Sequence, residues 1–295
     1  MPAIANFPTT YPFQDNPLIV KLGDPIVTFA PDSTAFLPTI SSAQFMPSVI
    51  DYDSYGVIKR YLDFRGLVGG TSDRCTRDTQ VVSAQDFTLE CWVKITDLNT
   101  PQNANGQWII AERGPNATAN FNYQLNWSKP NKWFNFSVRN NNSTVTFTAS
   151  SLDSATLQIE NNQWRHIAAV CSYDEVKDSC YLTVYVDGQP GTTSQFYEPT
   201  GRYIPASNDF VLGLAGFGNT TNCGLCLIGS LDEVRVWSEA RTQEQIIRYK
   251  NKRLRCAESN LIAYYRMNEG SGSTLGDCAG SAENLTIIGC PWITN

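Results

Sequence analysis

Histidine, basic clusters and long apolar runs are scarce in this chain of 295 residues, and each shortage excludes a class of protein. His166 is the single histidine, which excludes the histidine-rich sites of most metalloenzymes. The formal net charge is −6 and no basic block is present, so nucleic acid is not an expected partner. No apolar run approaches the roughly 20 residues that a membrane-spanning helix needs. The first residues also lack the basic and apolar regions of a signal peptide.

Sequence motifs of catalysis are missing around His166. A lone histidine can serve a serine or cysteine nucleophile, but no Gly-x-Ser-x-Gly elbow accompanies it. The surrounding segment, "QWRHIAAV", leads into an apolar strand, so a core histidine is the favoured interpretation. No EF-hand spacing is present either.

What the chain does contain is typical of a globular protein rich in β-strands. Apolar residues make up 42% and aromatic residues 12% of it, which is enough for a sizeable core. From about Tyr61 onward, short segments alternate apolar and polar residues and are separated by turns. "DFTLECWVKI", for example, places Phe87, Leu89, Cys91 and Val93 on one face. This pattern predicts stacked antiparallel sheets.

One helix signal interrupts the strands. Thr242 is followed three residues later by Gln245, and this capping box predicts a short helix near residues 242–254. The dipeptide Asp187-Gly188 predicts a tight turn between two strands. The expected fold class is therefore all-β, an antiparallel β-sandwich with one short helix.

Residues 1–60 differ from the rest of the chain. Eight of the fifteen prolines fall between Pro2 and Pro47, and proline at this density blocks helices and interior strands. The segment is also apolar, unlike an ordinary flexible tail. We therefore expect an extended N-terminal arm that lies either on the domain formed by residues 61–295 or on a neighbouring subunit.

Six segments in series carry a resemblance to a known fold. They are "YLDFRG", "FTLECWVKI", "NQWRHIAAV", "LTVYVDGQ", "GSLDEVRVWSEARTQEQI" and "LIAYYRMNEGSGSTLGDCAGSAENLTI". Over residues 61–290 their order resembles the concanavalin A-like lectin/glucanase jelly roll, in its laminin G-like and pentraxin-like branch. The resemblance implies a jelly-roll sandwich but leaves the function open, because this fold hosts lectins, adhesion modules, enzyme appendages and scaffolds. A calcium ion is implied by the resemblance alone, and no other cofactor is expected.

Asp232 and Glu233 look like the paired carboxylates of a hydrolase. Neighbouring side chains of a regular strand point to opposite faces, so this pair could not flank one glycosidic bond at the roughly 5–9 Å that hydrolysis needs. Related glucanases place their acids in an E-x-D-x-x-E pattern, which is absent here. The resemblance implies a structural role for the pair. We therefore expect no catalytic residue and no enzyme activity.

Nine cysteines indicate an oxidising compartment, which would pair most of them and leave one over. The disulfide candidates are Cys171 and Cys180, Cys223 and Cys226, and Cys278 and Cys290. The first two flank the tip of a predicted hairpin, and the last two could close the C-terminal segment. The middle two have the spacing of a redox or zinc motif, with Cys256 among the further ligands available. Their position in a loop favours disulfides or free thiols.

The hairpin "WSKPNKW" carries the candidate ligand site. It sets Trp127 and Trp133 on the two shoulders of a turn, where exposed indoles stack on sugar rings or anchor a protein. Nearby polar contacts would come from Tyr123, Asn126, Asn131 and Lys132. The alternative is that both indoles pack inside the sandwich or under the N-terminal arm. No metal site is assigned.

Two functions from different classes follow from these observations. The favoured one is a non-enzymatic structural or attachment protein with a lectin-like body, docked through residues 1–60 onto a larger assembly such as a virus particle or an extracellular surface. The alternative is a stand-alone carbohydrate-binding lectin or adhesion module of a secreted protein, and a glycoside hydrolase is a remote third. Expected partners are proteins of the assembly and glycans.

Overall fold

The computed structural model describes residues 60–99, 106–113, 121–139, 145–199, 209–214, 225–280 and 284–294. Nearly all of the predicted N-terminal arm lies outside the described residues. The arm, its docking role and the domain boundary near residue 60 therefore stay predictions from the sequence.

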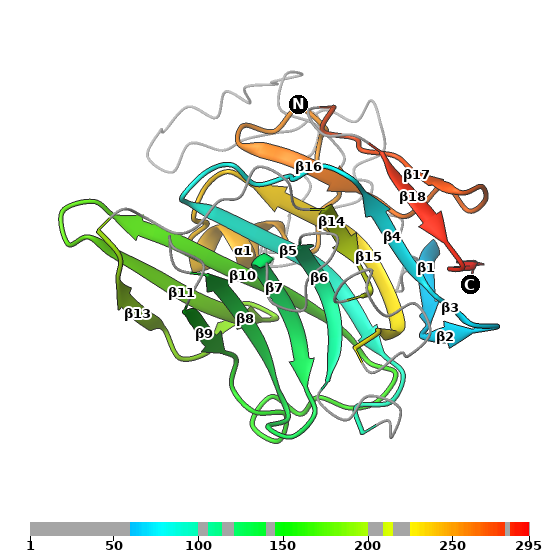
Figure 1. Ribbon diagram of the computed structural model, residues 1–295, viewed down its shortest axis with the longest axis horizontal. Helices are drawn as coiled ribbons and strands as arrows, with labels where there is room; N and C mark the ends of the chain where they lie inside the picture. Colours follow the sequence, from blue (N-terminus) through cyan, green and yellow to red (C-terminus); the bar gives the residue numbers. More distant parts are fainter. Residues whose placement is uncertain are drawn as a thin grey trace, which may run out of the picture. The chain divides into compact units, whose positions relative to one another are not determined.

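Two antiparallel sheets make up most of the described chain (Figure 1). The first sheet has the order β12-β11-β10-β5-β15-β1-β19, with β13 paired to β11 and β16 paired to β15. Its strands are β1 Arg60–Arg65, β5 Phe87–Ile95, β10 Trp164–Asp174, β11 Ser179–Val186, β12 Gln189–Pro190, β13 Ser194–Tyr197, β15 Ile228–Trp237, β16 Leu261–Tyr265 and β19 Trp292–Thr294. The predicted antiparallel β-sandwich is confirmed.

The second sheet has the order β17-β18-β4-β14-β6-β7-β8-β9. Its strands are β4 Arg74–Arg77, β6 Gln107–Arg113, β7 Phe121–Ser128, β8 Trp133–Arg139, β9 Thr146–Ser150, β14 Asp209–Leu212, β17 Thr274–Leu275 and β18 Leu285–Ile288. A small separate ribbon joins β2 Leu67–Val68 to β3 Thr71–Ser72. The order is not the order of the sequence, so strands distant in the chain lie side by side, as β14 and β6 do.

The core lies between the two sheets and is built from alternating residues. Phe87, Leu89, Cys91 and Val93 of β5 are all buried in it, as the sequence pattern predicts. The ring of Phe87 meets the ring of Tyr123 from β7, with the centroids 5.0 Å apart. Because every second residue of a strand faces the core, the residues between them face outward on both sheets.

Helix α1, Gln243–Tyr249, covers part of the outer face of the first sheet. Its buried Ile246 packs on Ala168 and Val170, which point outward from β10. The predicted capping box at Thr242 is confirmed. No helix among the described residues is long and apolar enough to cross a membrane.

The helix ends at Tyr249, earlier than the sequence pattern predicts. The reason lies in the sheet beneath it, where Arg235 donates to the carbonyl oxygens of Tyr249 at 3.1 Å and Lys252 at 2.6 Å. The indole of Trp92 donates to the carbonyl oxygen of Lys250 at 2.9 Å. Side chains of the sheet thus bind the carbonyl groups at the end of the helix and in the loop that follows it.

Candidate functional site

Strand β15 is irregular at Asp232 and Glu233. Its register against β5 shifts between Asp232 and Arg235, and Glu233 has a φ of 51°. The extra residue forms a β-bulge, which brings both carboxylates to the outer side of the first sheet. The prediction that these two side chains diverge is wrong, because it assumed an unbroken strand.

Glu233 belongs to a buried network of charges, and the buried Asp232 lies next to it. Arg235 contacts Glu233 at 2.8 Å and Glu90 at 3.4 Å, and Arg241 contacts Glu90 at 3.2 Å. The hydroxyl of Tyr264 donates to the same oxygen of Glu233 that Arg235 contacts. All of these side chains are buried. The carboxylates of Glu90 and Glu233 are therefore paired with arginines inside the protein, as buried charges require, and no substrate can reach them.

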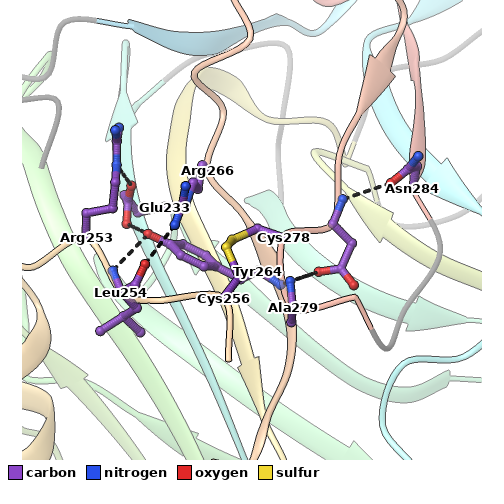
Figure 2. The surroundings of a disulfide bond; sticks show 10 residues. Glu233, Arg253, Leu254, Cys256, Tyr264, Arg266, Cys278, Ala279 and Asn284 are labelled. Carbon is purple, nitrogen blue, oxygen red and sulfur yellow. Dashed lines mark hydrogen bonds and ion pairs between the residues drawn. A yellow bond between two sulfur atoms is a disulfide. The ribbon is translucent and has the colours of Figure 1, made fainter. Parts of the chain in front are cut away.

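A disulfide holds the cover of this network in place. Figure 2 shows the bond between Cys256 and Cys278 beside the ring of Tyr264. Cys256 belongs to the loop after α1, which also carries Arg253, 3.7 Å from Glu233. The bond therefore ties the covering loop to the segment that follows β17. The predicted pairing of Cys278 with Cys290 is wrong, because the covering loop brings Cys256 to Cys278 instead.

The other predicted cysteine pairs have mixed outcomes. Cys171 lies opposite Leu182 in the β10–β11 register, and Cys180 lies opposite Tyr173. The two are diagonal neighbours in this register, and both are buried without a disulfide. Cys290 is also a buried thiol. Cys226 is disulfide-bonded, whereas Cys223 lies outside the described residues.

Burial sets the protonation of two groups near the network. It raises the pKa of Asp232 well above its usual value, and the neighbouring Glu233 raises it further. Burial also lowers the pKa of His166 well below 6.5, and Arg235 adds to the effect. His166 is thus a neutral core histidine, as the sequence indicates. Neither group is placed to exchange protons with a ligand, because both are shut away from solvent.

A cavity of about 220 Å³ opens next to the network, between α1 and β15. It is lined by Trp237, Glu239, Arg241, Gln245, Tyr249, Glu258, Ser259 and Asn260. Its central polar groups already bind one another, since Glu239 accepts from Arg241 at 3.1 Å and from Asn260 at 2.7 Å. Both oxygens of the Glu239 carboxylate in this cavity are therefore already bound.

The outer face of the second sheet has a different chemistry. Leu125 and Trp127 of β7 lie in the core, so Gln124 and Asn126 point outward. Asn126 lies directly opposite Asn135 of β8. Side-chain amides from two adjacent strands thus gather on the outer face.

Two indoles flank these amides. Trp108 of β6 lies opposite Asn126, and its Nε1 donates to Oε1 of Gln124 at 3.0 Å. Trp133 of β8 lies on the same face, two residues from Asn135. Both indoles are half-buried. We call the surface formed by Trp108, Gln124, Asn126, Trp133 and Asn135 the amide face.

The amides keep unused hydrogen-bonding capacity. Asn135 accepts a hydrogen bond from Ser150 of β9 at 2.8 Å through its Oδ1, which leaves its nitrogen available. Asn126 is only 5% exposed, and no hydrogen bond reaches its side chain from the residues that the structure describes. The Asn126 amide therefore has donor and acceptor positions that a ligand or water can fill. In β7, β8 and β9, which are described in full, no outward residue is acidic.

The structure divides the residues predicted to bind a ligand. Trp127 is 1% exposed and donates to the carbonyl oxygen of Leu98 at 3.1 Å, and Tyr123 is also buried. These two residues lie in the core, contrary to the expected exposed position, because the odd-numbered residues of β7 face inward.

The remaining predicted residues lie on the outer face of the second sheet or at the turn between two of its strands, although Asn126 is only 5% exposed. Asn126 and Trp133 belong to the amide face. Asn131 and Lys132 are exposed at the turn between β7 and β8, where Asn131 donates to Ser128 at 3.1 Å. Ligand binding by these residues stays a prediction.

Three residues of the amide face were not predicted from the sequence: Trp108, Gln124 and Asn135. The alternation of "NYQLNW" and "FNFSV" would have placed two of them with Asn126, because it marks which residues share a face. Nothing in the sequence near Trp108 shows that β6 pairs with β7 in this register.

Metal binding has no structural counterpart in the described ranges. They contain no group of three or more His, Cys, Asp or Glu side chains that could hold a metal ion. Asp73, a buried acid between β3 and β4, is paired with Arg65 at 2.9 Å.

Comparison with known families identifies the fold. A laminin G family profile, described as the concanavalin A-like lectin/glucanases superfamily, matches residues 69–247. The chain belongs to this superfamily. The match covers β5 and β15 of the buried network and β6, β7 and β8 of the amide face.

Two solved structures of low sequence identity share the fold. A presumed carbohydrate-binding protein from Bacteroides ovatus aligns over 80% of this superfamily member and 60% of its own chain, at 17% identity and a TM-score of 0.55. A heptameric SAP-like pentraxin from Limulus polyphemus aligns over 80% of this chain and 95% of its own, at 18% identity and a TM-score of 0.52. No curated protein matches the chain in sequence.

Proposed function

We propose that this chain is a non-enzymatic carbohydrate-binding protein and that the amide face is its binding surface. The observation that carries the proposal is the unpartnered Asn126 amide between two outward indoles. Indole faces stack on the apolar faces of sugar rings, and amides bind their hydroxyl groups. Membership in a superfamily of lectins and glucanases is consistent with this function.

The absence of acids from the outward residues of β7, β8 and β9 supports binding over hydrolysis. Glycoside hydrolysis needs a proton donor and a second carboxylate on either side of the bond. Gln124 and Asn126 occupy alternating outward positions but carry amides, which cannot transfer a proton in this way. The acids Glu90 and Glu233 are bound to arginines on the other sheet.

The proposal includes attachment to a larger assembly through residues 1–60, as the sequence predicts. That role is separable from sugar binding, since the amide face is built entirely from β6, β7 and β8. A chain lacking residues 1–55 is therefore expected to keep its glycan binding and to lose its association with an assembly.

Glycan-array binding followed by calorimetry tests the proposed surface. We expect Trp108→Ala and Asn126→Ala each to weaken binding at least about tenfold, the effect of losing a central contact residue worth more than about 1.4 kcal/mol. Tyr197→Ala is the matched control, because Tyr197 is an aromatic residue that is 69% exposed on the first sheet. Unchanged binding in both amide-face variants would show that the surface is wrong.

A further inference from the structure

We propose that the amide face binds a linear glycan of at least three sugar rings, lying diagonally across the strands from Trp108 to Trp133. The inference rests on the proposed function and specifies the ligand's length and direction. Its basis is the position of the two indoles relative to the amides between them.

The strand register fixes how far apart the indoles are. Trp108, Asn126 and Asn135 lie in one row across β6, β7 and β8. Trp133 is two residues further along β8. Two strand spacings across the sheet and two residues along a strand place the Cα atoms of Trp108 and Trp133 about 12 Å apart. One pyranose ring is too short to contact both indoles.

The side chain of Trp108 adds to this separation. Its Nε1 donates to Gln124, which lies on one side of the row formed with Asn126. Trp133 lies opposite Ser128, on the other side of that row. The Trp108 indole therefore leans away from Trp133 rather than toward it.

The middle of the diagonal is polar. Asn126 and Asn135 lie directly opposite each other there, and each has an amide nitrogen without a partner among the described residues. A sugar ring above them would receive hydrogen bonds, while the rings on either side would stack on Trp108 and Trp133. This arrangement defines three subsites in series, with an aromatic one at each end.

A second feature favours an extended neutral chain over a compact charged ligand. The five residues of the amide face carry no charge, so hydrogen bonds and stacking supply the binding. The surface belongs to three neighbouring strands of one sheet, which suits a ribbon-like ligand. Neutral, linear oligosaccharides are therefore the appropriate probes.

Calorimetry with oligosaccharides of increasing length tests the inference. The probes are cellohexaose, xylohexaose, mannohexaose and chitohexaose, each compared with its own mono-, di- and trisaccharide. For the polymer that binds, we expect affinity to rise at least about tenfold between the monosaccharide and the trisaccharide. Affinity should change little for oligosaccharides longer than those that cover the whole amide face.

Removal of one end subsite sharpens the test. Trp133→Ala should weaken trisaccharide binding about tenfold and change disaccharide binding by less than about twofold, because a disaccharide can still occupy Trp108 and the amides. Tyr197→Ala should change neither. A structural defect in Trp133→Ala would weaken both ligands equally, and that result would overturn the inference.

The outcomes separate the inference from the proposed function. Equal affinity for the monosaccharide and the hexasaccharide of one polymer would overturn the three-ring site and leave sugar binding intact. No binding of any hexasaccharide would overturn the proposed function and the inference together.

Discussion

Acidification from pH 6.5 to 5 provides a direct test of the buried network, because two groups respond to it with opposite sign. His166 has a pKa below its unfolded value of about 6.5. The stability it contributes is complete above pH 6.5 and is lost as the pH falls. Asp232 has a pKa above its unfolded value of about 3.9. Its contribution is complete below that value and is lost as the pH rises through the raised pKa.

The size of each effect on stability follows from the single proton that each group binds or releases. A difference of one bound proton between the folded and unfolded chain changes the free energy of unfolding by about 1.4 kcal/mol per pH unit. When the pH falls from 6.5 to 5, His166 lowers the free energy of unfolding by up to about 2 kcal/mol. Asp232 raises it by up to about 2 kcal/mol over the same range. The two effects have opposite sign and therefore offset each other in the native chain.

Single substitutions should separate the slopes. His166→Phe keeps a ring against Trp92, which the imidazole meets edge-on at 5.5 Å, and should become more stable on acidification. Asp232→Asn should become less stable over the same range. Because slopes are compared, a constant loss of stability from either substitution does not affect the result.

Urea unfolding followed by tryptophan fluorescence, at several pH values between 5 and 6.5, measures these slopes. His166 is the only histidine, so no other imidazole contributes. Asp209 also has a raised pKa, through burial, but it is present in every variant and cancels. If the free energy of unfolding of His166→Phe changes with pH as it does in the native chain, His166 is not a buried neutral imidazole. The description of the network would then be wrong.

Two further predictions concern stability. Trp127→Ala should lower the free energy of unfolding by about 3–5 kcal/mol, the cost of emptying a core site, whereas Trp133→Ala should cost clearly less. Urea unfolding checks this, and similar losses would contradict the assignment of Trp127 to the core. Cys256→Ser opens a loop with a sequence separation of 22 and should cost about 3 kcal/mol. Glycan binding by this variant should be unchanged below its unfolding temperature, since the disulfide lies on the first sheet, and weaker binding there would show that the two sheets are coupled.

Local sequence patterns determined most strands and the start of the helix. β5 spans "FTLECWVKI" as the alternation predicts, because a strand that buries one face must place apolar residues at every second position. The capping box at Thr242 fixed the start of α1 through bonds within four residues. Its end depended on Arg235 from a distant strand and was not predictable from the same pattern.

The candidate site depended on contacts between distant segments. Alternation showed that Gln124 and Asn126 share a face, but the register of β6 against β7 placed Trp108 beside them. The same holds for the cysteines, because the fold of the covering loop selected Cys256 as the partner of Cys278.

The sequence by itself determined which side chains share a face of a strand, since the backbone repeats every two residues whatever surrounds it. The tertiary structure decided which outward faces become buried and which stay accessible. It enclosed the acids of the first sheet with α1 and the loop after it, and it left Trp108, Gln124, Trp133 and Asn135 of the second sheet half-buried. A one-residue bulge at Glu233 was enough to reverse the direction expected for a carboxylate, because such a bulge is set by packing between strands rather than by local alternation.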